Sequence, residues 1–99
     1  MESGQIQRLR KNPRIHVVDN PNGDTTIYLD NRLLLQTDKH GAVSAFQADS
    51  RAARYVINMV LDPARYKVYD NILIEYKDGV VLSALSPMEV LLRWKRKES

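Results

Sequence analysis

The stretch ILIEYKDGVVLSAL, residues 72–85, decides the fold. Two runs rich in strand-forming residues, 72–77 and 80–85, flank Asp78-Gly79, a pair that favours the positive φ angles of a two-residue hairpin turn. Such a turn places Lys77 opposite Val80, so opposed residues share a face of the sheet. The face that we expect to be buried holds Ile72, Ile74, Tyr76, Val81, Ser83 and Leu85.

A second hairpin is expected upstream. Residues 14–19 and 25–29 are rich in β-branched side chains, and the Asn22-Gly23 pair between them favours a turn. The remaining expected strands are 32–37, 42–47 (with the start of a helix as the alternative) and 65–69.

A central helix is expected to follow and to run to Leu61. Asp49 or Ser50 can accept hydrogen bonds from the free amides of its first turn, and Asp62-Pro63 ends it because proline disfavours helical geometry in the preceding residue. The apolar side expected to face the core consists of Ala52, Tyr55, Val56, Met59 and Val60, whereas Gln47, Arg51, Arg54 and Asn58 lie on the polar side.

A terminal helix is expected after residue 85. Ser86, Pro87 and Glu89 match a capping box with proline at the first helical position. Its apolar arc comprises Met88, Val90, Leu91, Leu92 and Trp94, and its polar arc comprises Glu89, Arg93, Arg96 and Lys97. We expect Met88, Leu91, Leu92 and Trp94 to be largely buried, and the basic side to face water or a partner.

These elements predict an α+β fold: an antiparallel sheet built from β-hairpins, with the central helix and the C-terminal amphipathic helix packed on it. Residues 1–13 are predicted to be a flexible basic arm with one short helical turn around Ile6–Arg10, and residues 14–99 a single α+β domain. Part of the apolar arc of the last helix could be buried between two subunits, which makes a homodimer a reasonable expectation.

Composition restricts the function. The 99 residues carry a net charge of +3, concentrated at the two ends, and include no cysteine. The lack of cysteine predicts an intracellular, cytoplasmic protein without disulfides, and no apolar run is long enough for a signal peptide or a membrane span.

The sequence contains no recognisable catalytic or metal-binding motif. His16 and His40 lie in an expected strand and an expected turn, without the spacing of a metal site, and the glycines are isolated rather than grouped into a phosphate-binding loop. We therefore predict that the protein is not an enzyme and has no cofactor and no metal site.

The basic and aromatic stretch 65–69 has two interpretations. Its tyrosines could stack on bases while its cations hold phosphates. The favoured interpretation is an edge strand with Tyr66 and Val68 pointing inward and Arg65, Lys67 and Tyr69 pointing outward.

Two functions remain. The first is a small nucleic-acid-associated or regulatory protein whose basic ends contact phosphates largely independently of sequence. Its candidate contacts are Arg8, Arg10, Lys11, Arg14, Arg93, Arg96 and Lys97. The alternative is a protein-interaction or assembly module, an adaptor or an inhibitor, that acts through a sheet edge or through the C-terminal helix.

Overall fold

The computed structural model describes residues 4–98, which fold into three helices and seven strands. In chain order these are α1 (Gly4–Arg10), β1 (Ile15–Asp19), β2 (Thr25–Leu29), β3 (Arg32–Thr37), β4 (Val43–Phe46), α2 (Arg51–Val60), β5 (Tyr66–Tyr69), β6 (Ile72–Lys77), β7 (Val80–Leu85) and α3 (Pro87–Glu98). The predicted α+β class is confirmed, and residues 43–46 are a strand rather than the start of a helix.

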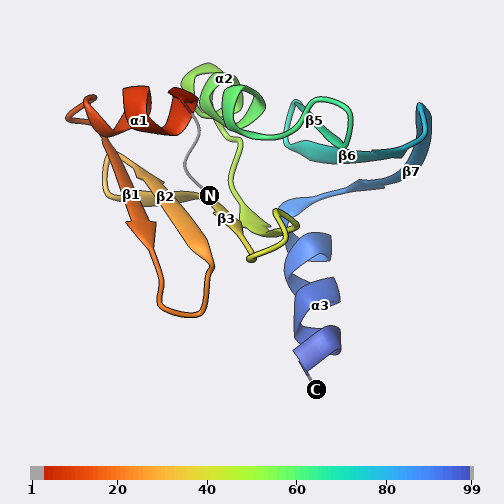
Figure 1. Cartoon of the computed structure of the whole chain (residues 1–99). Coiled ribbons are helices and arrows are strands. Elements are labelled where there is room, and N and C mark those ends of the chain that lie inside the picture. Colours follow the sequence, from red (N-terminus) through yellow and green to blue (C-terminus); the bar gives the residue numbers. More distant parts are fainter. Residues whose placement is uncertain (1–3, 99) are drawn as a thin grey trace.

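The strands are divided between two antiparallel sheets, in the orders β1-β2-β3-β4 and β5-β6-β7. Figure 1 shows α1 and α2 along one side of the molecule, whereas α3 extends from the opposite side. A single hydrophobic core joins both sheets to all three helices. Its most completely buried side chains are Ile27, Leu34, Leu35, Ile57, Leu73 and Val90.

The turns follow the local sequence. Asp78 and Gly79 have φ angles of 53° and 77°, and Lys77 pairs with Val80, as the two-residue hairpin requires. The first hairpin has a longer connection, because β1 ends at Asp19 and β2 begins at Thr25. The predicted hairpins are both present.

The predicted core face of the β6–β7 hairpin is wrong for β6 and for Val81, whereas Leu85 packs against the core as expected. A bulge between Glu75 and Tyr76 shifts the register, so that Leu73 lies opposite Leu85. Leu73 is completely buried, whereas Ile72 and Ile74 are only half-buried. The extra residue is Leu82 of β7, since Tyr76 pairs with Val81 and Glu75 with Ser83. It places Ser83 and Leu85 opposite Glu75 and Leu73, so alternation counted from the turn does not hold along β7 beyond the bulge.

Helix α2 begins where Ser50 caps it: the Ser50 Oγ accepts a hydrogen bond from the Ala53 N–H at 3.1 Å. The buried residues of α2 are Ala53, Val56 and Ile57. The expectation that Ala52 and Tyr55 face the core is therefore wrong, and Tyr55 is 69% exposed.

The N-terminal segment contains a packed helix. Ile6 and Leu9 of α1 are buried, and α1 contacts β1 and α2. Spacing of three residues puts both apolar side chains on one face of the helix, which is enough to attach even this short element to the core. The segment expected to be a flexible arm thus includes a helix that contributes to the core.

Candidate interaction surfaces

The start of α3 is fixed by a reciprocal cap. The Ser86 N–H donates to Glu89 Oε1 at 2.9 Å, and the Glu89 N–H donates to Ser86 Oγ at 3.2 Å, which confirms the predicted capping box. These hydrogen bonds, first of all the one from the Ser86 backbone, hold the pKa of Glu89 below its ordinary value. The cap sets where the helix leaves β7.

Helix α3 packs on the body through one narrow stripe. Val90 is completely buried, and Val90, Arg93, Trp94 and Lys97 line a hollow between α3 and the strands β4, β5 and β6. This spacing of three and four residues is that of one helical face. The stripe includes Arg93, which was expected to face water or a partner, whereas Lys97 lines the hollow and is exposed.

Glu75 explains this orientation. The Arg93 guanidinium and the Ser83 hydroxyl both donate to Glu75 Oε1, each at 2.5 Å, and the Glu75 side chain is only 18% exposed. Burial acts to raise the pKa of Glu75, but the hydrogen bonds from Arg93 and Ser83 outweigh it and the pKa lies below its ordinary value. An ionised carboxylate on β6 therefore attracts Arg93 and fixes the rotation of α3.

As a result, α3 turns much of its apolar arc outward. Met88 is 63% exposed, Leu92 is 46% exposed and Leu91 is also exposed, so the expectation that these residues are buried is wrong. Trp94 is half-buried. At about 100° per residue, Met88 and Leu92 lie on the opposite side of the helix from Val90.

Strand β7 adds further exposed apolar residues: Val80, Val81 and Leu82 are between 55% and 64% exposed. We call these three residues, together with Met88, Leu91 and Leu92, the β7–α3 apolar surface. The three residues of β7 lie next to the Asp78-Gly79 turn, and the three residues of α3 follow the other end of the strand, so they form two groups. Grouped exposed hydrophobic residues are typical of an interaction site.

Strand β7 is also an open edge. Within residues 4–98 it pairs only with β6, and the β6–β7 hairpin bends away from the rest of the molecule (Figure 1). Each edge strand also contacts a helix: β1 contacts α1, β4 contacts α3, β5 contacts α2, and β7 contacts α3, the helix that follows it. On its outer side, β7 presents unpaired backbone groups.

The seven cations predicted to contact phosphate are in different situations. Arg10 pairs with Asp19 and Arg14 with Asp30, both at 2.6 Å, and Arg93 pairs with Glu75. The hydrogen bond from Arg14 holds the pKa of Asp30 below its ordinary value. The remaining four, Arg8, Lys11, Arg96 and Lys97, are exposed.

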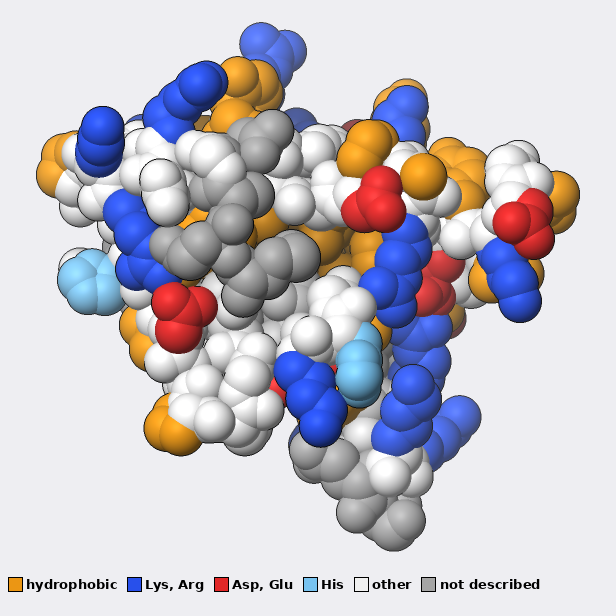
Figure 2. All heavy atoms as spheres, viewed as in Figure 1, with side chains coloured by type: hydrophobic (Ala, Val, Ile, Leu, Met, Phe, Trp, Pro, Cys, Tyr) orange, Lys and Arg blue, Asp and Glu red, His pale blue; other side chains and the backbone are white. Residues whose placement is uncertain are grey.

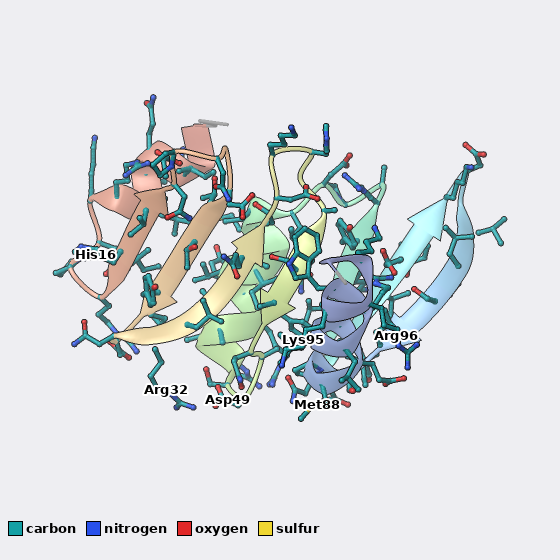
Figure 3. All side chains as sticks on the ribbon, turned by 90° about the horizontal axis from the view of Figure 1, so that it is seen from below. His16, Arg32, Asp49, Met88, Lys95 and Arg96 are labelled. Carbon is teal, nitrogen blue, oxygen red and sulfur yellow. The ribbon has the colours of Figure 1, made fainter. Side chains whose placement is uncertain are left out.

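The structure does not bring the two basic ends together. Helices α1 and α3 lie on opposite sides of the molecule, and the cations near them form separate groups (Figures 1 and 2). Figure 3 shows the molecule from below, with Met88, Lys95 and Arg96 at α3 and His16 on β1 at the other side of the picture.

A different surface combines tyrosines with cations. Tyr66 and Val68 of β5 are buried and Tyr69 is 66% exposed, which confirms the favoured interpretation of this stretch as an edge strand. Tyr69 lines a hollow together with Tyr55, and the same hollow is lined by Arg51, Arg54, Asn58, Lys67, Val68 and Asp70. We call Tyr55, Tyr69, Arg51, Arg54 and Lys67 the tyrosine–cation surface.

This surface was not predicted, because the helical pattern placed Tyr55 on the apolar side of the central helix. The alternating burial of β5 correctly placed Tyr69 outside, but nothing in the sequence linked it to Tyr55 on α2.

The described part of the chain was also searched for metal sites and membrane-spanning helices. No group of three or more histidine or acidic side chains there could hold a metal ion. His16 is exposed on β1, and His40 lies in the turn after β3, where its N–H donates to Asp38 Oδ1. No helix between residues 4 and 98 is both long and apolar enough to cross a bilayer.

Comparison with known proteins gives no relative from which a site could be transferred: no family model, no curated protein and no solved structure matches the chain.

Proposed function

We propose that this protein is an assembly module that pairs with a second copy of itself through the edge of β7 and the outward side of α3. The observation that carries the proposal is the orientation of α3, which docks through Val90 and Arg93 and leaves Met88 and Leu92 in the solvent. A helix that exposes the apolar side of an amphipathic sequence is stabilised when a partner covers that side.

The edge of β7 suits strand pairing. Its six residues, VVLSAL, include neither a charged residue nor a proline, the features by which natural edge strands prevent pairing. By contrast, edge strand β1 contains His16 and Asp19, and edge strand β5 contains Lys67. Strand β7 is thus an edge that is both accessible and chemically unprotected.

A second copy is the favoured partner because β7 is self-compatible. Antiparallel pairing of β7 with the same strand around a two-fold axis would place apolar residues against apolar residues and oppose no like charges. Helix α3 begins two residues after β7 ends, so its outward residues, Met88 and Leu92, would lie next to the same interface. Strand pairing would then cover the exposed residues of β7, and helix packing would cover those of α3.

The proposal that the basic ends bind nucleic acid has less support. Within residues 4–98, Arg10, Arg14 and Arg93 are ion-paired with carboxylates, and the two groups lie at or next to helices on opposite sides of the molecule. A single polyanion would have to pass around the body to contact both groups.

The test is molar mass by light scattering as a function of protein concentration. The chain of 11.4 kDa should show a mass that rises toward twice this value. Leu82→Lys and Leu92→Lys should each remain monomeric, because a charge placed in an apolar interface is strongly unfavourable. Val18→Lys is the matched control, since Val18 is an exposed valine of edge strand β1, and this variant should still dimerise.

Two results would contradict the proposal. One is a monomer mass up to millimolar concentration. The other is a dimer that Leu82→Lys and Leu92→Lys leave intact, which would place the interface elsewhere.

A further inference from the structure

We propose that the tyrosine–cation surface binds single-stranded nucleic acid, with Tyr55 and Tyr69 stacking on bases and the surrounding cations holding phosphates. This activity goes beyond the proposed assembly function and uses another part of the molecule: α1, α2 and β5 lie on the side opposite α3 (Figure 1).

The two tyrosines are placed to act on a ligand. Helix α2 packs through Ala53, Val56 and Ile57, so Tyr55 is not required for the core. Tyr55 and Tyr69 are 69% and 66% exposed and line the same hollow, although one belongs to a helix and the other to a strand. Two accessible aromatic rings at one hollow are the kind of platform on which successive bases stack.

The hollow continues toward the N-terminal helix. Arg51 and Tyr55 also line a second hollow beside α1, together with Arg8 and Arg14. The other residues lining this second hollow are largely apolar and include Leu9, Ile15, Leu29, Val56 and Met59. Because Arg51 and Tyr55 of α2 line both hollows, the two hollows flank α2, and we call them together the track.

The charges along this track favour an anion. The described residues that line it include five cations and one acidic residue, Asp70. The cations are Arg8, Arg14, Arg51, Arg54 and Lys67. Within residues 4–98, Arg14 is ion-paired with Asp30, whereas Arg8, Arg51 and Lys67 form no ion pair. Arg54 is held in place by a hydrogen bond from its Nη1 to the Ala48 carbonyl at 3.1 Å. Separated cations of this kind can contact successive phosphates.

A single strand fits these features better than a duplex. In a duplex the bases are stacked on each other, so their faces are not available to Tyr55 and Tyr69. Reading a duplex would require an element that enters a groove, and α2 is held against the core by its buried face. An acidic peptide could form ion pairs with the cations, but its carboxylates would not stack on the rings of Tyr55 and Tyr69.

The test is fluorescence anisotropy with labelled oligothymidylate and oligouridylate of about 20 nucleotides, and with a duplex of equal length. Both single strands should bind more tightly than the duplex. If four cations neutralise phosphates, log affinity should fall against log salt concentration with a slope of about −2.8, from about 0.7 for each phosphate.

The variants separate stacking from charge. Tyr55→Ala and Tyr69→Ala should each weaken binding by about 5- to 150-fold, the range measured for loss of one stacked base. Tyr55→Phe and Tyr69→Phe keep the rings and should bind nearly as the parent protein does. Lys95→Ala removes an exposed cation of α3 and serves as the charge control, with little expected effect. Trp94 emission reports that each variant is folded.

Three outcomes would overturn the proposal. The first is no binding of either single strand at low salt. The second is unchanged affinity in Tyr55→Ala and Tyr69→Ala. The third is displacement of the oligonucleotide by polyglutamate at equal charge concentration, which would show that the surface selects negative charge alone.

Discussion

At the scale of single residues, Glu75 has the largest influence on what the protein exposes. Its carboxylate joins Arg93 of α3 to Ser83 of β7, so three elements meet at one side chain. Because Arg93 turns toward Glu75, Met88 and Leu92 on the far side of the helix turn toward solvent. A polar contact thus determines where the apolar surface lies.

Glu75→Gln should lower the free energy of unfolding at pH 7 by about 1–2 kcal/mol, because the charge-assisted hydrogen bond to Arg93 is weakened. The pKa of Glu75 is lowered in the folded protein from a reference value of 4.5. Its contribution is therefore present above about pH 4.5 and is lost as the pH falls through the lower folded value. The difference in free energy of unfolding between Glu75→Gln and the parent protein should therefore become smaller as the pH falls below about 4.5. Urea titrations at fixed protein concentration measure this difference.

Asp49→Asn is the control for this prediction. Asp49 pairs with Arg32 at 2.9 Å, but both side chains are largely exposed (Figure 3), so the loss should be less than about 0.5 kcal/mol. An equal loss for Asp49→Asn and Glu75→Gln, or a Glu75→Gln difference that is constant down to pH 3, would show that Glu75 has no special role.

At the scale of secondary-structure elements, the turns, helix caps and helix ends were predicted correctly from local sequence patterns. Asp78-Gly79 gives the turn, Ser50 and Ser86 cap their helices, and Asp62-Pro63 follows the end of α2. Each of these features depends on neighbouring residues alone, which is why the hairpins and helices could be predicted.

The same rules could not predict which side of an element faces the core. The extra residue Leu82 exchanges the faces of β7 beyond the bulge, and the apolar arc of α3 is too wide for the body to cover. Tyr55 belongs to a similarly wide arc on α2 and ends outside. Contacts between segments far apart in sequence decide which side of a helix or strand faces the core. The candidate surfaces therefore could not be predicted from local sequence patterns.

Ser86→Ala should reduce the free energy of unfolding by about 1 kcal/mol, since the Glu89 N–H would lose its capping acceptor. Ser86→Asp keeps an acceptor and should restore most of the loss. Thermal unfolding followed by circular dichroism measures both. Equal stability of the alanine variant and the parent protein would mean that α3 is held by its packing through Val90 and Arg93 alone.

At the scale of the whole molecule, the two surfaces use different elements. The β7–α3 apolar surface belongs to the hairpin and the last helix, whereas the tyrosine–cation surface belongs to α2 and β5 (Figure 1). Of the predicted phosphate contacts, Arg8 and Arg14 line the track beside Tyr55, whereas Arg93, Arg96 and Lys97 belong to α3. Pairing through β7 would leave the track open in each copy.

The most direct test of assembly through β7 is amide hydrogen exchange of residues 80–85 as a function of protein concentration. In a single chain, the β7 amides that point away from β6 have no strand partner and should exchange rapidly. Strand pairing with a second copy predicts that the same amides become protected as concentration rises, and that Leu82→Lys abolishes this protection. Rapid exchange of these amides at every concentration, in a protein whose light-scattering mass is that of a dimer, would contradict pairing through β7.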